Sequence, residues 1–215
     1  MRPHYWFGWN FLRLSARILF GFRVVGEEKI PREGGVIIAP NHVSYFDPPI
    51  AGLACRREAH FLAKRELFQV WFLGWLIAKY NAIPVRRGAI AKSTLQNVLG
   101  VLRGGGALLL FPEGTRSKSG RVGEPFPGIG MIAAQAGVPI VPVYVRGTNR
   151  LRRSIWKRGH LTAFVGDPIP PLRVGPEEDR KERYRELAVT VTARIRELSE
   201  RYREPVEDGP AKAET

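Results

Sequence analysis

The 215-residue sequence is poor in the residues that build disulfides and zinc sites. Its single cysteine, Cys55, excludes an intramolecular disulfide, and its four scattered histidines argue against a bound metal. Acidic residues are also few, because 20 Asp and Glu stand against 34 Lys and Arg, for a formal net charge of +14. Such an excess favours polyanionic partners, namely nucleic acid, anionic lipid or a phosphorylated substrate, without choosing among them.

Long uninterrupted apolar runs are absent as well. The stretch 5–22 is rich in aromatic and aliphatic residues, but Asn10, Arg13 and Arg17 interrupt it before it reaches the roughly 18 apolar residues of a membrane-spanning helix. On a helix these three residues line one stripe. The pattern predicts either a helix in a membrane interface, with the arginines toward anionic headgroups, or a terminal helix packed on the core. The apolar residues around the stripe are Trp6, Trp9, Phe11, Leu12, Ile18, Leu19 and Phe22.

Short apolar runs alternate with helical patterns along the rest of the chain. Buried strands are expected at 36–39, 60–63, 82–85, 107–111, 140–145 and 161–165. Helices are expected at 49–55, 66–79, 91–102 and 129–136, with a last surface helix over 184–202. This alternation predicts an α/β fold with a mostly parallel central sheet flanked by helices.

The chain is expected to comprise three parts. A membrane-associating helical segment at 1–25 precedes an α/β domain at 26–204, and a flexible tail follows at 205–215. Within the domain, the aromatic run 71–77 could line an acyl chain or contact a bilayer. Ordinary core packing is the favoured interpretation, because large aromatic side chains dominate core burial.

Polar residues suited to acid–base chemistry follow the first expected strand of this domain. His42 and Asp47 leave its carboxyl end, where ligands gather in α/β sheets. Histidine can remove a proton from a hydroxyl near neutral pH, and a carboxylate can hold its ring in the right tautomer. Since no G-x-S-x-G nucleophile elbow is present, the hydroxyl of a bound acceptor could be the nucleophile. The structural alternative is that Asp47 caps the next helix and His42 bonds a loop carbonyl.

A second polar loop follows the expected strand at 107–111. Its residues 111–117 read Phe-Pro-Glu-Gly-Thr-Arg-Ser. Gly114 permits a turn or a close approach to a ligand, and Arg116 offers a planar fork suited to phosphate. The alternative is a surface loop with a solvated arginine. Two such loops at strand ends favour a shared site.

Together the two loops resemble the signatures N-H-x-x-x-x-D and F-P-E-G-T-R-S of the 1-acyl-sn-glycerol-3-phosphate acyltransferase family. Weaker family blocks fall at 83–87 and 138–143, so the resemblance covers about residues 36–148. It implies transfer of a fatty acyl group from acyl-CoA or acyl-carrier protein to the free hydroxyl of lysophosphatidic acid, which gives phosphatidic acid. The acyl donor is a co-substrate, and no cofactor or metal is implied.

The resemblance also implies a role for each matching residue. His42 would be the general base and Asp47 its orienting partner. Arg87 would bind the acceptor phosphate, although the doubled arginine at 86–87 leaves this ligand ambiguous by one position. Lys64, where relatives have a lysine near the pocket, would contact a phosphate or oxyanion, or else is an exposed strand-end lysine.

The second loop would complete the acceptor side of the site. Glu113 and Arg116 would belong to the acceptor-phosphate side, and Gly114 and Thr115 would shape the loop. The expected partners are lysophosphatidic acid, an acyl thioester and an anionic membrane surface. A peripheral or monotopic protein on the cytoplasmic face of the cell membrane follows from these partners.

Two other functions remain open at this point. The same His-Asp chemistry could act on another lysophospholipid or glycerolipid acceptor. A non-catalytic basic protein that binds membrane or nucleic acid is supported by the charge of +14, but no nucleic-acid motif accompanies that charge. Nucleic acid is therefore not expected as a partner of the favoured enzyme.

Overall fold

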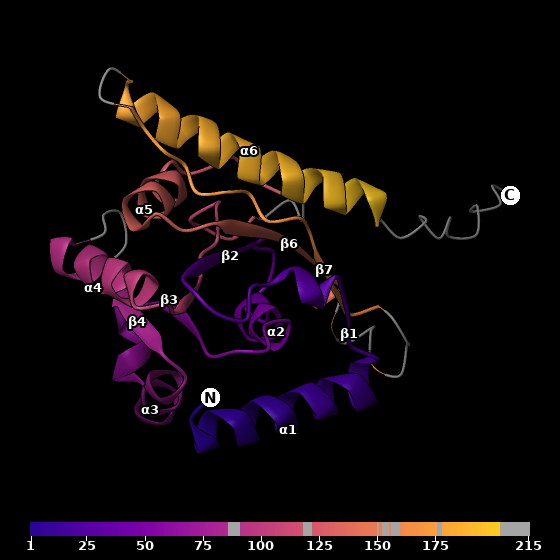
Figure 1. Ribbon diagram of the computed structural model, residues 1–215. Coiled ribbons are helices and arrows are strands. Elements are labelled where there is room, and N and C mark those ends of the chain that lie inside the picture. The colour runs from indigo at the N-terminus through magenta and orange to yellow at the C-terminus, as the bar shows by residue number, and fades with distance from the viewer. Residues whose placement is uncertain are drawn as a thin grey trace, which may run out of the picture.

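A seven-stranded sheet forms the centre of the computed structural model, which describes residues 1–85, 91–117, 122–149, 151, 155, 160–175 and 178–202 (Figure 1). The strands are β1 (Arg23–Val25), β2 (Val36–Pro40), β3 (Ala59–Lys64), β4 (Ala82–Val85), β5 (Ala107–Leu109), β6 (Ile140–Arg146) and β7 (Thr162–Val165). Their order is β1-β7-β6-β2-β5-β3-β4. Every neighbouring pair is parallel except β6 and β7, which confirms the mostly parallel sheet.

Helices cover both faces of this sheet. They are α1 (Pro3–Phe20), α2 (Asp47–Leu53), α3 (Trp71–Lys79), α4 (Lys92–Arg103), α5 (Gly128–Ala136) and α6 (Arg180–Arg201), with 3-10 turns η1 (Glu27–Lys29) and η2 (Arg65–Gln69). Alternate residues of β2 serve two cores: Val36 and Ile38 pack toward α1 and α2, and Ile37 and Ala39 toward α4, α5 and α6. Figure 1 shows α6 on one side of the sheet and α1 on the other.

Apart from shifts of a few residues at the ends of elements, the expected elements differ from the observed ones in two places. The helix expected at 66–79 is divided into η2 and α3, because Val70 has an extended backbone (φ −80°, ψ 107°). The three-residue β1 was not predicted, since so short a run gives no periodic signal. The expected tail at 205–215 lies outside the described residues.

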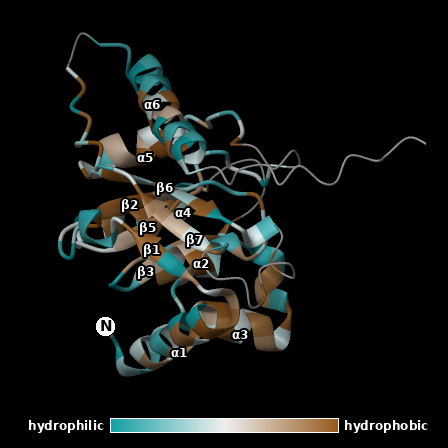
Figure 2. Ribbon diagram, turned by 90° about the vertical axis from the view of Figure 1, so that its right-hand side faces the viewer, coloured by the Kyte–Doolittle hydropathy of each residue, from teal (hydrophilic) through white to brown (hydrophobic). Residues whose placement is uncertain are grey.

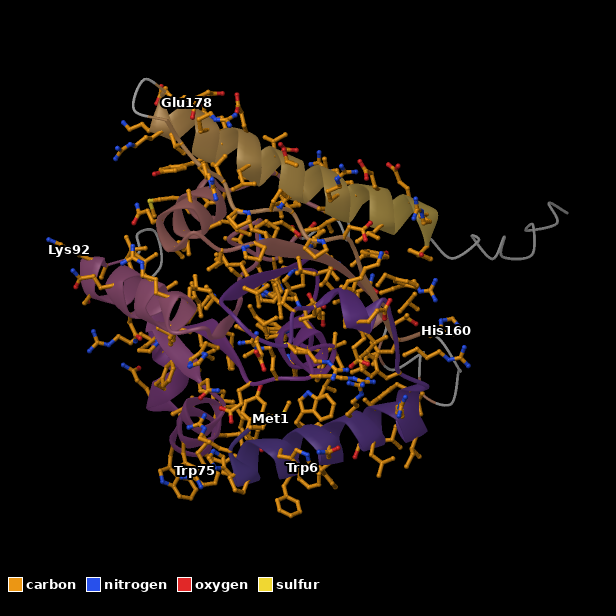
Figure 3. The ribbon with its side chains drawn as sticks, in the orientation of Figure 1. Met1, Trp6, Trp75, Lys92, His160 and Glu178 are labelled. Atoms are coloured by element: carbon orange, nitrogen blue, oxygen red, sulfur yellow. The ribbon has the colours of Figure 1, made fainter. Side chains whose placement is uncertain are left out.

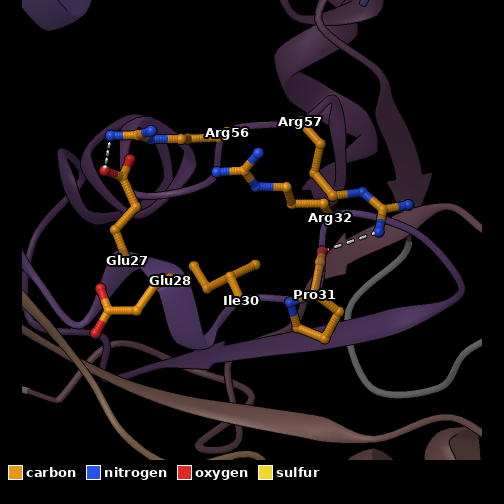
Figure 4. Close-up of a pocket in the computed structure, with 7 residues that line it drawn as sticks. All are labelled: Glu27, Glu28, Ile30, Pro31, Arg32, Arg56 and Arg57. Carbon is orange, nitrogen blue, oxygen red and sulfur yellow. Dashed lines mark hydrogen bonds and ion pairs between the residues drawn. The ribbon is translucent and has the colours of Figure 1, made fainter.

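One arginine joins the turns that lead into the central strands. Arg57, just before β3, donates through Nη1 to the carbonyls of Pro31 (3.1 Å) and Gly34 (2.9 Å), and through Nη2 to the carbonyl of Gly105. These turns precede β2 and β5. A pocket of about 110 Å³ lies beside this arginine, at the amino edge of the sheet (Figure 4). It is lined by Glu27, Glu28, Ile30, Pro31, Arg32, Arg56 and Arg57.

Helix α1 carries its central arginine inward. Arg13 is 8% exposed, and its guanidinium donates to both carboxylate oxygens of Glu27 and to the carbonyl of Leu53 (3.1 Å). It also lies over the Trp9 ring, 4.7 Å from the centroid. The expectation that Arg13 faces headgroups was wrong, because Glu27 neutralises it inside the fold. Arg17 is exposed as expected, and Phe22 is buried in the core.

Apolar side chains of α1 and α3 face outward instead. Trp71 is 87% exposed and Phe11 70%, and Gly74 is the one buried residue of α3, so core packing was the wrong interpretation of 71–77. The two helices lie side by side, as Figure 2 shows, and Tyr5 and Tyr80 hold them together with ring centroids 5.4 Å apart. We call the exposed set the aromatic face. It comprises Trp6, Phe7, Phe11, Trp71, Phe72 and Trp75.

Figure 3 places Trp6 and Trp75 on the same outer side of the molecule, away from the sheet. None of the helices in the described part of the chain has both the length and the hydrophobicity needed to cross a bilayer.

Candidate active site

The polar loops meet at the carboxyl edge of the sheet. His42 follows β2, whose neighbours are β5 on one side and β6 on the other. The loops after β5 and β6 therefore flank the histidine, because the three strands are parallel. Each contributes a contact to it or to its partner.

His42 and Asp47 form a hydrogen-bonded pair. His42 Nδ1 lies 3.1 Å from Asp47 Oδ2, and the Asp47 side chain is fully buried. The same oxygen accepts the backbone N–H groups of Val43 and Ser44, both at 2.6 Å. The other oxygen, Oδ1, accepts the hydroxyl of Thr148. A neutral ring that donates from Nδ1 keeps the lone pair of Nε2 for a proton.

The helix-cap interpretation of Asp47 was wrong. Helix α2 begins at Asp47 itself, its N-cap is Phe46, and no side chain caps it. The carboxylate turns back toward its own loop instead of forward along the helix. Its contacts therefore serve the histidine loop.

The second loop holds the backbone of His42 on both sides. Glu113 Oε1 accepts the N–H of His42 at 3.0 Å, and the carbonyl of His42 accepts the N–H of Ser117 at 2.8 Å. The His42 ring stacks on Phe111, with centroids 4.1 Å apart and planes at 26°. The ring stays partly open to solvent, with its side chain 17% exposed.

Glu113 is a half-buried carboxylate beside this pair. Burial raises the pKa of Glu113 above its usual value, the N–H of His42 lowers it, and the charge of Asp47 raises it again. A second backbone N–H, that of Gly123, also lowers the pKa of Glu113. The carboxylate that was expected on the phosphate side thus contacts the His42 backbone.

The tip of the second loop is exposed. Gly114 has φ 64°, a left-handed conformation that suits glycine, and Thr115 and Arg116 follow it in solvent. The guanidinium of Arg116 lies 3.6 Å from the ring centroid of Tyr45, itself 75% exposed. This contact brings a cation from the β5 loop to the β2 loop, next to the histidine.

Of the two other expected site residues, one lies further along the same edge and the other falls outside the described part of the chain. Lys64 ends β3 and is exposed, and β5 separates its strand from β2. Arg87 follows β4 and lies outside the described residues, as does Arg86. In the described part of the chain, no three His, Cys, Asp or Glu side chains are grouped so as to hold a metal ion.

Two buried side chains support the site without having been predicted to do so. Asn41 Oδ1 accepts the N–H of Val145 at 2.6 Å, and its Nδ2 donates to the carbonyl of Val145 at 3.1 Å. Thr148 reaches Asp47 across 101 residues of sequence. Asn41 belonged to the recognised signature, but no local pattern marks Thr148.

Known proteins resemble this chain in sequence and fold. The sequence model of the family described as acyltransferase matches residues 21–146. The 1-acyl-sn-glycerol-3-phosphate acyltransferase of Bacillus subtilis is 28% identical over 193 residues, which cover 88% of this chain and 94% of that protein. The lyso-ornithine lipid O-acyltransferase of Pseudomonas aeruginosa is 37% identical over 140 residues, which cover 64% of this chain and 52% of that protein.

A solved structure agrees with these matches. The crystal structure of the 1-acyl-sn-glycerophosphate (LPA) acyltransferase from Thermotoga maritima superposes with a TM-score of 0.69 at 26% sequence identity, covering 95% of this chain and 86% of that one. The family model spans more than half of the sequence and includes both polar loops. The chain therefore belongs to the acyltransferase family, which includes the 1-acyl-sn-glycerol-3-phosphate acyltransferases.

Proposed function

We propose that the protein transfers a fatty acyl group from acyl-CoA or acyl-carrier protein to the free hydroxyl of 1-acyl-sn-glycerol-3-phosphate, forming phosphatidic acid. The observation that carries the proposal is the contact of His42 Nδ1 with the buried carboxylate of Asp47, at the open carboxyl edge of the sheet. The names of the Bacillus and Thermotoga relatives support this acceptor.

His42 acts as general base and then as general acid. Its Nε2 takes the proton of the acceptor hydroxyl as the hydroxyl oxygen attacks the carbonyl carbon of the thioester. The tetrahedral intermediate collapses with cleavage of the C–S bond, and the proton passes from His42 to the departing sulfur. One C–O bond replaces one C–S bond. The negative charge of Asp47 stabilises the imidazolium that exists between the two proton transfers.

Cations at the same edge bind the phosphate of the acceptor. Arg116 is exposed, and its contact with Tyr45 leaves its N–H donors available around the ring plane. Lys64 contributes further positive charge from the end of β3, and the match to the family signature assigns Arg87 to the phosphate as well. Glu113 serves the base rather than the phosphate, because its carboxylate accepts the N–H of His42.

A second acceptor is favoured by one comparison. The Pseudomonas relative is named for a lyso-ornithine lipid, an acceptor of another class. The two acceptors are distinguished by the phosphate group. If the phosphate is recognised, Arg116→Ala lowers kcat/KM for lysophosphatidic acid more than for the ornithine lipid.

The test is acyl transfer by the purified protein. It is offered lysophosphatidic acid, glycerol-3-phosphate or a lyso-ornithine lipid, each with acyl-CoA or acyl-carrier protein, and the product is identified by mass spectrometry. We expect phosphatidic acid from the first acceptor and a loss of about 10²- to 10⁴-fold in kcat for His42→Ala. A folded His42→Ala protein with near-wild-type kcat would refute the mechanism.

The aromatic face attaches the enzyme to the membrane that holds its acceptor. An exposed apolar patch of this kind is typical of a contact surface, and tryptophan favours the depth of the headgroups. An open groove of about 510 Å³ runs along α1, lined by Trp6, Trp9, Arg13, Arg17, Arg56 and Met1. Arg17, exposed on α1, adds attraction to anionic lipid. The attachment that we propose is peripheral or monotopic, on the cytoplasmic face of the membrane.

Vesicle sedimentation tests this attachment. The double variant Phe11→Ser, Trp71→Ser removes two strongly exposed aromatic side chains and is expected to weaken binding to phosphatidylglycerol vesicles at least about tenfold. Val189→Ser is the matched control, because Val189 is 49% exposed on α6, across the sheet from α1. Equal binding by the double variant and the control would contradict the proposal.

A further inference from the structure

Thr148 reaches Asp47 because the end of β6 is fixed to the end of β2. The Asn41 side chain pairs with both backbone groups of Val145, where the β2–β6 ladder would otherwise stop. The chain then turns at Gly147, whose φ of 94° is open to glycine and where a Cβ would lie 2.2 Å from the carbonyl oxygen of His160. The next residue is Thr148, 2% exposed, with its hydroxyl on Asp47 Oδ1.

The two oxygens of Asp47 are held differently. Oδ2 receives the N–H groups of Val43 and Ser44 and faces Nδ1 of His42. Thr148 is the donor to Oδ1 in the described part of the chain. The carboxylate is planar, so its two oxygens move together when it rotates about the Cβ–Cγ bond. A hydrogen bond at Oδ1 therefore adds a second restraint against the rotation that would carry Oδ2 away from Nδ1 of His42. Because both side chains are buried, water does not readily take the place of the hydroxyl.

We infer that Thr148 is a positioning residue for the reaction: its hydroxyl restrains rotation of the Asp47 carboxylate and so keeps Oδ2 directed at Nδ1 of His42. The inference rests on the proposed role of His42 as base. In this assignment Thr148 contacts neither the acyl acceptor nor the acyl donor, so its removal should change the rate of the chemical step and not the binding of either substrate.

Four variants test the inference. Thr148→Val keeps the shape and removes the hydroxyl. Thr148→Ser keeps the hydroxyl and removes the methyl group, and Thr148→Ala removes both. The Ser and Ala variants leave the same methyl space empty, so this pair remains informative even if the valine variant fails to fold. Thr192→Val is the matched control, because Thr192 is 1% exposed and donates to the carbonyl of Ala188 within α6, at 3.0 Å.

Steady-state kinetics give the first readout. We expect Thr148→Val and Thr148→Ala to lower kcat on the order of tenfold with KM within about twofold of wild type. Thr148→Ser should retain most of kcat, and Thr192→Val should match the wild type. Equal losses in Thr148→Ser and Thr148→Ala would overturn the inference, since the methyl group would then be what matters. A normal kcat in folded Thr148→Val would also overturn it.

Nuclear magnetic resonance gives a readout that needs no turnover. The chain has four histidines, so the ring nitrogens of His42 in ¹⁵N-histidine-labelled protein can be assigned by their loss in His42→Ala. At a pH where the ring is neutral, we expect one tautomer in wild type and Thr148→Ser, and a shift toward mixed tautomers in Thr148→Ala. Unchanged ring signals in Thr148→Ala would contradict the inference. Failure of the proposed function instead appears as retained turnover in His42→Ala.

Discussion

The Asp47 carboxylate places a negative charge beside His42 and accepts hydrogen bonds from its own loop and from Thr148. Two substitutions separate these two roles. Asp47→Asn keeps an oxygen for the N–H groups of Val43 and Ser44, while its amide can face the Thr148 hydroxyl, which accepts as well as donates. The buried network survives, but the negative charge beside His42 is lost. Asp47→Ala removes the charge and leaves all of these donors without their acceptor.

The contacts set the size of each effect. An unmade hydrogen bond to a buried donor costs about 1 to 3 kcal/mol, and the N–H groups of Val43 and Ser44 are part-buried, so the lower half of that range applies to each. Asp47→Ala is then expected to lose about 2 to 4 kcal/mol of unfolding free energy, or about 4 to 16 °C in melting temperature for a chain of this size. Asp47→Asn should melt within a few degrees of wild type and lose about 10²- to 10⁴-fold in kcat.

Thermal melts and acyl-transfer kinetics on the same preparations provide the assay. His42→Ala is the matched comparison, because it removes the base and leaves Asp47 with three of its donors. An Asp47→Asn protein with wild-type kcat would show that the charge does not serve His42. An Asp47→Ala protein with a wild-type melt would show that the loop does not depend on this carboxylate.

Three further predictions concern buried ionisable groups. Because burial raises the pKa of Glu113, its ionisation costs stability as pH rises through the folded pKa; Glu113→Gln, which still accepts the His42 N–H, should melt at or above wild type at pH 8, and a lower melt would contradict this. Burial alone would raise the pKa of Glu27, but hydrogen bonds from Arg13 and Arg56 lower it below its usual value. The ionised Glu27 therefore stabilises the folded protein above about pH 4.5, and this contribution is lost as pH falls through the folded pKa. In urea titrations Arg13→Ala should cost about 3 kcal/mol at pH 7 and less in acid, whereas a pH-independent loss would refute the pairing. Burial raises the pKa of Cys55 to about 11, so iodoacetamide at pH 8 should label it only as the protein unfolds in urea, and fast labelling of native protein would refute its burial.

Local signals predicted the parts of the fold that depend on local sequence. Val36–Pro40 is buried on both faces, and its uninterrupted apolar run, followed by polar residues, identified both the strand and the loop that leaves it. His42 and Asp47 are five residues apart within that loop, so their contact could be anticipated from sequence. Thr148 could not, since its partner is brought to it by a ladder between β2 and β6.

The orientation of α1 shows where periodicity fails. The spacing of its polar residues predicted a helix correctly, but the rule that arginine faces solvent assigned Arg13 to the wrong side. An arginine is stable inside a protein when a carboxylate meets it there, and Glu27 lies on a separate element. The expectation that large apolar side chains are buried failed for Trp71 and Phe72 of α3, which are exposed. A single sequence does not show which apolar side chains are exposed for contact with a membrane or another molecule instead of being buried in the core.

The hydrogen bonds of Arg57 bear on how the fold opens. One side chain in the turn before β3 joins the turns before β2 and β5, so loosening the β3 turn removes a contact of both others, and loosening either of those removes a contact of Arg57. The three strands should therefore behave as one cooperative unit in native-state amide hydrogen exchange, with the slowest amides and a common dependence on denaturant. Strands β1 and β4 lie at the two edges of the sheet, and the hydrogen bonds of Arg57 do not reach the turns that lead into them. Their amides should exchange first, by fraying that leaves the centre closed.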